Sequence, residues 1–157
     1  MLKILTLGFV MTLASIASSD AQQPLSYGPS ISLDAVKRIM AAAEAEATKN
    51  NWRVVIAIVD AAGRQQLLTR MDDAPYGSIP IAIGKAETAF NFRQATKQLQ
   101  DRVNSGTAMH LLTSGSTLIE GGIPLVIAGK VVGAIGVSGG ATFQDEQVAK
   151  AGAGALL

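Results

Sequence analysis

GGIPLVIAGKVVGAIGVSGG, at residues 121–140, predicts a β-hairpin that leads through a glycine-rich turn into a last helix. The two apolar arms meet around Ala128-Gly129-Lys130, and glycines recur at positions 133, 136, 139 and 140. Because glycine has no Cβ, these positions allow close approach of another backbone or a positive φ. Thr142 and Asp145 have the spacing of a capping box at the helix start. The turn therefore lies where a pocket or an interface is readily built.

The segments before this hairpin favour an α+β sandwich with an antiparallel sheet. Ser32 has the character of an N-cap for a helix that ends before Asn50-Asn51. The β-branched run at 54–59 is typical of a buried strand, and Asp60-Ala61-Ala62-Gly63 turns it into a second strand over 65–70. Helices are predicted over 79–92, with Ser78 as the cap, and over 96–103, with one helical turn near 109–112. Helices and strands in this order are typical of an α+β fold.

The first 21 residues have the pattern of a secretory signal peptide. Lys3 supplies a positive n-region, residues 4–13 are apolar, and Ser19-Asp20-Ala21 offers a cleavage site before Gln22. The alternative, a membrane anchor, is disfavoured because the apolar run is shorter than the roughly 20 residues that span a bilayer. We expect an exported protein, periplasmic or secreted, with a loose arm over 22–31 and a single domain over 32–157.

Composition excludes several classes of protein. The chain has 13 basic and 12 acidic residues and no basic run interleaved with aromatic side chains, so nucleic acid is not an expected partner. The absence of cysteine excludes disulfides and thiolate metal sites, and the single histidine excludes a two-histidine zinc site within one chain. The apolar content of 48% and the slim helix over 79–92, which carries Gly84 beside Lys85, Glu87 and Arg93, predict an interface helix in a homo-oligomer.

Six blocks of sequence resemble the GlcG/HbpS family, which also supplies the C-terminal domain of PduO-type adenosyltransferases. They are Val59-Asp60-Ala61-Ala62-Gly63, Arg70-Met71-Asp72, Lys85-Ala86-Glu87-Thr88-Ala89, Gly121-Gly122-Ile123-Pro124, Gly133-Ala134-Ile135-Gly136-Val137-Ser138-Gly139 and Gln144-Asp145-Glu146. The resemblance covers about residue 33 to the end. It implies a profilin-like fold, with about five antiparallel strands and helices packed on both faces, assembled into tetramers or octamers.

The resemblance also implies a function. An exported member is most similar to the extracellular branch of the family, which binds heme, so heme or a related tetrapyrrole is the expected ligand and cofactor. Other members are linked to cobalamin chemistry and to glycolate operons. An enzyme or accessory protein acting on a small hydroxy or oxo acid, or on a cobalamin-related ligand, is therefore the alternative. A non-catalytic structural oligomer is the second alternative, and catalysis itself is left open.

Two loops are predicted to bind the ligand. Ser138, Gly139 and Gly140 offer backbone amides to an anion such as a heme propionate, with tight packing as the alternative role. Arg70 and Asp72 follow a strand, and the Arg70 guanidinium suits a carboxylate, with an ion pair to Asp72 or Asp60 as the alternative.

His110 is the predicted ligand of a heme iron, because imidazole is a common axial donor. Met71, Met109 and Tyr76 are the other side chains able to coordinate it, and Tyr76 is also placed in the ligand-binding set. The expected cleft is lined by residues 70–76, 108–113 and 137–140, near a subunit boundary. This assignment comes from the residues and not from a motif of the family.

Overall fold

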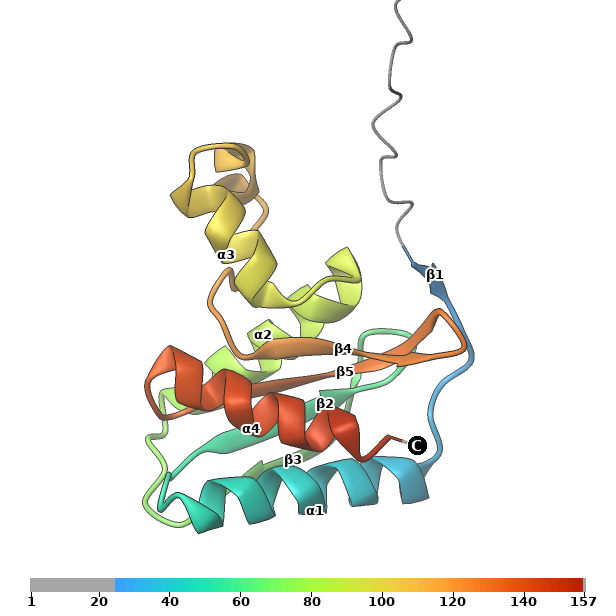
Figure 1. Cartoon of the computed structure of the whole chain (residues 1–157), viewed down its shortest axis with the longest axis vertical. Helices are drawn as coiled ribbons and strands as arrows, with labels where there is room; N and C mark the ends of the chain where they lie inside the picture. Colours follow the sequence, from blue (N-terminus) through green and yellow to red (C-terminus); the bar gives the residue numbers. More distant parts are fainter. Residues whose placement is uncertain (1–24, 157) are drawn as a thin grey trace, which may run out of the picture.

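The structure, a computed structural model, describes residues 25–156. Figure 1 shows its elements, which are β1 (Ser26–Tyr27), α1 (Leu33–Lys49), β2 (Val55–Val59), β3 (Gln65–Arg70), α2 (Ser78–Phe92), α3 (Thr96–Asn104), the 3-10 helix η1 (Met109–Thr113), β4 (Gly122–Ile127), β5 (Lys130–Ser138) and α4 (Thr142–Gly154). The predicted signal peptide and the expected start at Gln22 lie outside the described residues. Within those residues, no helix is both long and apolar enough to cross a membrane.

Four strands form an antiparallel sheet in the order β4-β5-β2-β3. The short strand β1 joins β5 in parallel, with Ser26 opposite Lys130 and Tyr27 opposite Val131. Because β4 already pairs with these two β5 residues, β1 takes the β5 edge that β2 occupies further along. The arm predicted to be loose is therefore paired at 26–27, and the sheet has five strands with helices on both faces, as expected.

Helices α1 and α4 cover one face of the sheet with a core of large aliphatic side chains (Figure 1). Side chains alternate across a strand, so Val54, Ile56 and Ile58 face this core while Val55, Ala57 and Val59 face the other side. The pairing of β4 with β5 shifts register between Leu125 and Val126. This irregularity explains why Val132 and Ile135, three residues apart, point to the same core.

Helix α2 covers the opposite face and packs directly on the sheet backbone. A Cβ at Gly136 would lie 2.2 Å from the Ala82 carbonyl oxygen, and one at Gly122 would lie 2.4 Å from that of Lys85. The small residues that suggested an interface helix are therefore used for packing inside the subunit. Lys85, expected with Glu87 and Arg93 on an interface helix, is 1% exposed within the single subunit.

The caps differ from the prediction at two of three helices. Ser32 caps α1 as expected, since its Oγ accepts from the Ala35 amide at 3.2 Å. Helix α2 begins at Ser78 itself, with Gly77 as N-cap, because the preceding turn already accepts the Ser78 and Ile79 amides. Helix α4 has Ala141 as N-cap in place of Thr142, and the Gln144 side chain accepts from the Ala141 amide at 2.9 Å.

Candidate functional site

The two predicted ligand loops meet at one end of the sheet. Arg70 of β3 and Ser138 of β5 both lie opposite Val55 of β2, one on each side of it. Gly139 has a φ of +142° and packs against Arg53, whose carbonyl oxygen would be 2.5 Å from an added Cβ. The Gly140 amide donates to Asp145 Oδ1 at 2.9 Å. This turn is therefore tightly packed, and its Gly140 amide is already bonded within the chain.

Arg70 lines a polar hollow of about 490 Å³ at this end of the sheet. The other lining residues are Arg53, Met71, Asp72 and Asp73. Arg70 Nη1 donates to the Ala74 carbonyl at 3.1 Å, and its guanidinium carbon lies 4.6 Å from the centre of the exposed Tyr76 ring. Among the described residues Arg70 has no ion-pair partner, so the alternative pairing with Asp72 or Asp60 is not formed. The hollow suits a small carboxylate better than an apolar macrocycle.

His110 lies apart from these loops. It is exposed on η1, whose Leu111 packs with Leu99 and Ala108 in a separate small core beneath α3. Figure 1 shows α3 and the segment after it projecting beyond α2, away from the 71–77 loop beside α1. Arg70, Asp72, Tyr76 and the 138–140 turn therefore share one region, whereas His110 does not join them within a single chain. Its role as an iron ligand stays a prediction.

A buried ion pair, which the sequence analysis missed, joins α2 to the start of α4. Lys85 Nζ lies 2.8 Å from Asp145 Oδ2 and donates to the Val137 carbonyl at 2.9 Å. Burial raises the pKa of the Asp145 carboxyl, while the Lys85 ammonium and the Gly140 and Gly139 amides act in the opposite direction. Lys85 follows Ala82 by three residues and precedes Ala89 by four. This helical spacing puts Lys85 on the buried face of α2, and it was the sequence pattern from which its burial could have been predicted.

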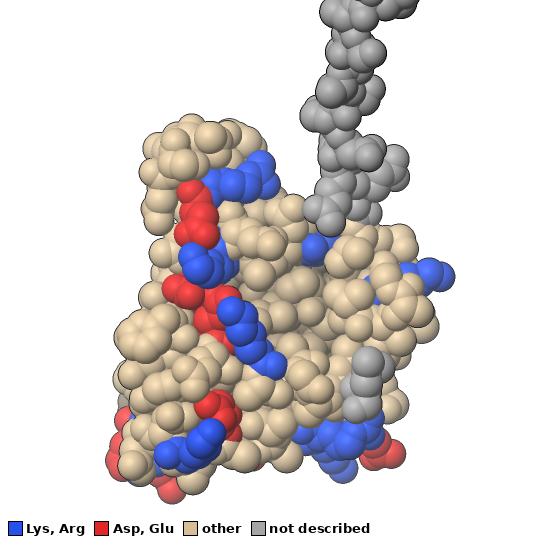
Figure 2. All heavy atoms as spheres, viewed as in Figure 1, with Lys and Arg blue, Asp and Glu red and all other residues tan. Residues whose placement is uncertain are grey.

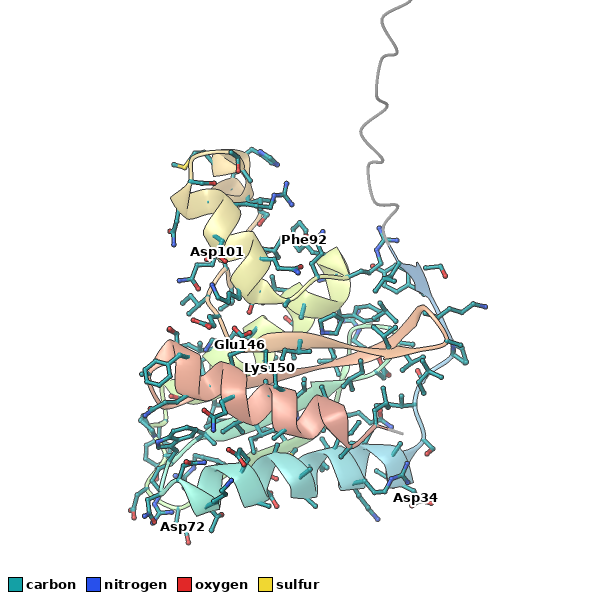
Figure 3. All side chains as sticks on the ribbon, viewed as in Figure 1. Asp34, Asp72, Phe92, Asp101, Glu146 and Lys150 are labelled. Carbon is teal, nitrogen blue, oxygen red and sulfur yellow. The ribbon has the colours of Figure 1, made fainter. Side chains whose placement is uncertain are left out.

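Two carboxyl groups meet beside this ion pair. Glu146 is 5% exposed, its Oε1 pairs with Lys150, and its buried Oε2 has no hydrogen-bond donor from the described residues. The neighbouring Glu146 carboxyl and burial together raise the pKa of Glu120, whose Oε2 accepts from Thr142 at 3.2 Å. Figure 3 shows Glu146 and Lys150 along α4 and Asp101 on α3, and Figure 2 shows acidic and basic side chains alternating along this face.

An apolar pocket of about 480 Å³ lies at the other end of the sheet, between α1, the β4–β5 turn and the C-terminal residues. Its lining consists of Pro29, Ser30, Ile31, Ser32, Ala35, Arg38, Ile127, Ala128, Lys130, Val132 and Leu156. The wall is held in place by main-chain bonds, since the Gly28 and Ile31 amides donate to the Val131 and Val132 carbonyls. Basic side chains flank this region in Figure 2, over the first part of α1 and at the hairpin tip.

Sequence analysis missed this pocket because its walls come from both ends of the chain. Residues 29–38 lie about 90 positions before the hairpin tip, and Leu156 follows α4. No local motif links such segments. Only the pairing of β1 with β5 and the packing of Leu156 into the main core bring them together.

Comparison with known proteins gives a consistent result. The HbpS-like family of haem-degrading proteins matches residues 31–154. Protein GlcG of Escherichia coli K12 is 42% identical over 100 residues, which cover 64% of this chain and 75% of that protein. The structure of HbpS superposes with a TM-score of 0.77 at 32% identity, covering 85% of this chain and 94% of that one.

A third similar structure is the complex of PduOC with heme. It superposes with a TM-score of 0.75 at 33% identity, covering 80% of this chain and 94% of that one. The six blocks of sequence that resemble the GlcG/HbpS family all fall within the matched residues. By this match, and by the fold that it shares with HbpS, the chain belongs to the HbpS-like family of haem-degrading proteins.

Proposed function

We propose that this protein binds heme or a related tetrapyrrole, and that the apolar pocket between α1 and the β4–β5 turn holds the macrocycle. The observation that carries the proposal is the pocket itself, whose walls include Ile31, Val132 and Leu156. Its volume of about 480 Å³ lies in the range typical of small-molecule sites. The similarity to a haem-degrading family and to the PduOC complex with heme supports a ligand of this class.

The chemistry of the lining fits heme. A planar apolar ring with two carboxylates needs apolar walls and cations at its edge. The pocket has both, because Arg38 of α1 and Lys130 of β5 lie on different sides of the apolar lining. Charge-assisted hydrogen bonds from such groups to a carboxylate are about twice as strong as neutral ones. Bound heme would supply a redox-active iron at the pocket, and these two residues would hold and orient the macrocycle through its carboxylates.

A hemin titration of the chain starting at Gln22 tests the proposal. Ile127 lines the pocket and is 38% exposed, so Ile127→Glu adds a negative charge to the wall at little cost to folding. We expect hemin affinity, read from the Soret band, to fall at least about tenfold, or 1.4 kcal/mol. Ile81→Glu is the matched control, because Ile81 is also 38% exposed but lies on α2 outside the lining.

The outcomes separate clearly. Loss of affinity in Ile127→Glu alone supports the pocket as the heme site. If hemin produces no Soret change in the parent chain, heme binding is wrong for this protein. If both glutamate variants bind hemin as the parent does, heme binding stands and the pocket is the wrong place for it.

A small hydroxy or oxo acid is the second candidate ligand, and one observation favours it. Arg53 and Arg70 both line the polar hollow, and Arg70 is already oriented by the Ala74 carbonyl and the Tyr76 ring. If this hollow binds glycolate, the ligand should raise the melting temperature of the parent chain but not that of Arg70→Ala. Equal shifts in both proteins would remove Arg70 from the site.

Export and self-association are also part of the proposal. Export is supported by the n-region, apolar region and cleavage site at residues 1–21. N-terminal sequencing of exported protein should find Gln22 first, and a membrane-bound product that keeps residues 1–21 would contradict export.

Self-association is supported by exposed apolar side chains such as Phe143, Leu112 and Met109. Light scattering at micromolar concentration should show an oligomer, and a monomer alone would contradict this.

A further inference from the structure

We infer that the apolar pocket recognises a tetrapyrrole by its ring and its two carboxylates and not by its metal, so that an iron-free porphyrin binds as tightly as heme. This inference rests on the proposed function. It concerns which part of the ligand the protein recognises. It assigns Arg38 and Lys130 as the residues that determine specificity for the two carboxylates.

The pocket lining has no strong donor for iron. Histidine nitrogen, cysteine thiolate, methionine sulfur and tyrosine oxygen are the usual axial ligands of heme. The chain has no cysteine, and its single histidine, His110, lies on η1 and not in the pocket. Among the described lining residues the only uncharged polar side chains are those of Ser30 and Ser32. A hydroxyl of this kind contributes little to iron affinity compared with an imidazole.

The side chains nearest in sequence that could coordinate iron are engaged elsewhere. Tyr27 precedes the pocket wall by two residues, but its hydroxyl donates to the Asn91 carbonyl at 3.1 Å. Met40 follows Arg38 on α1, but it is buried in the main core with Val36 and Ile39. Within the described chain, therefore, iron bound in this pocket has no protein ligand to favour it over a metal-free ring.

The two cations of the lining are available to the ligand. Arg38 and Lys130 are exposed, and neither forms an ion pair with any residue that the structure describes. Among the described residues that line the pocket, none is acidic and could compete for them. Two cations on different walls match the two propionates that heme and protoporphyrin IX share. Charge complementarity, and not coordination, is therefore the basis of selection.

The test compares hemin with protoporphyrin IX on the chain starting at Gln22. Tryptophan quenching and porphyrin fluorescence give both dissociation constants, which we expect to agree within about threefold. Arg38→Ala combined with Lys130→Ala should weaken both ligands by about tenfold or more and to the same extent. Lys37→Ala is the matched control, because Lys37 is the exposed base beside Arg38 and does not line the pocket. Protoporphyrin IX dimethyl ester, which lacks the carboxylates, should bind the parent as weakly as the acid binds the double variant.

Each outcome decides a separate question. Hemin binding that exceeds porphyrin binding tenfold or more overturns the inference, because it requires an iron ligand, while the proposed heme-binding function stands. Loss of hemin affinity in His110→Ala with porphyrin affinity unchanged overturns it in the same way and identifies the ligand. Binding of neither compound by the parent chain refutes the proposed function itself.

Discussion

The two faces of the sheet are stabilised by different means. On the side of α1 and α4, large side chains such as Ile39, Ile56 and Ile135 interdigitate. On the side of α2, most of the buried residues are alanine or valine, and Gly136 brings strand and helix backbones together. Packing of large side chains can adjust to a change of volume, whereas two backbones in contact cannot. Substitutions that change side-chain volume should therefore be tolerated better on the side of α1 and α4 than on the side of α2.

The apolar pocket and the buried ion pair follow the same division. The apolar pocket is continuous with the large-residue core, since Ile31, Ala35, Val132 and Leu156 belong to both. The buried polar groups, Lys85 and Asp145, lie where α2 meets the start of α4. The face covered by α1 and α4 thus provides an apolar cavity, and the face covered by α2 holds the buried Lys85 in place.

A valine at position 136 should abolish the folded state. Its Cβ would lie 2.2 Å from the Ala82 carbonyl oxygen and 2.4 Å from the Ala86 nitrogen, both of which belong to the α2 backbone. We expect Gly136→Val to cost more than about 5 kcal/mol, the lower limit of ordinary domain stability. The expected result is insoluble protein or the absence of a cooperative thermal transition in circular dichroism.

Gly154→Ala is the control, because a Cβ there meets no atom within 4 Å and the backbone is helical. It should leave stability unchanged or raise it by up to about 1 kcal/mol. A Gly136→Val protein that unfolds cooperatively near the parent temperature would show that α2 can move away from β5. The contrast between the two faces would then be wrong.

Lys85→Met should destabilise the protein by about 3–5 kcal/mol, because it leaves the buried Asp145 carboxylate without its partner. Urea denaturation measures the change. Lys97→Met is the control, because it removes an exposed ion pair with Asp101 of the same 2.8 Å length, and it should leave stability nearly unchanged.

Adding Asp145→Asn to Lys85→Met should recover a large part of the loss, since no unpaired buried charge remains and asparagine can still accept from the Gly140 amide. If the two substitutions are instead additive, the pair does not act as a unit. The assignment of Lys85 to a structural ion pair would then need revision.

Glu120→Gln should produce the smallest effect, and one that depends on pH. The pKa of Glu120 is raised above 4.5 by the neighbouring Glu146 carboxyl and by burial. A carboxyl with a raised pKa in the folded chain stabilises the fold below the unfolded pKa, and this contribution is lost as the pH rises through the folded pKa. The neutral glutamine avoids that loss. We expect the variant to be more stable than the parent at pH 7, by a few tenths to about 1 kcal/mol because the site is partly exposed.

The advantage of Glu120→Gln should disappear below about pH 4.5, where the parent carboxyl is protonated in both states. Thermal unfolding at several pH values between 4 and 8 measures the difference. A difference that stays constant over this range would mean that the two carboxyls do not share a proton.

Local sequence patterns predicted most of the secondary structure. The hairpin around Ala128-Gly129, the strand of β-branched residues at 54–59 and the Ser32 cap were all confirmed, because each depends on residues close together in the chain. Two caps were wrong, the one at α2 because the local turn at 75–76 accepts the Ser78 and Ile79 amides, and the one at α4 for a tertiary reason. Asp145, predicted to complete a capping box with Thr142, is drawn inward by Lys85 and accepts from Gly140 instead.

The candidate sites were harder to predict. Arg70 and Ser138 were correctly expected at a loop-bearing sheet end, and the register places them on either side of Val55. Within a single chain His110 lies apart from them, because α3 and η1 form their own small core around Leu99, and its part in a site stays a prediction. Loop proximity depends on how elements pack, which the spacing of residues along the chain does not encode.

The family, the α+β class and the positions of the strands could all be predicted from the sequence, since they follow from side-chain periodicity, turn chemistry and short motifs. Only the tertiary structure decided which charges are buried and where an apolar cavity forms. Lys85 and Asp145 are 60 residues apart, and the pocket joins residue 29 to residue 156. Such contacts arise from the packing of both sheet faces at once, and burial is a property of that packing and not of any single segment.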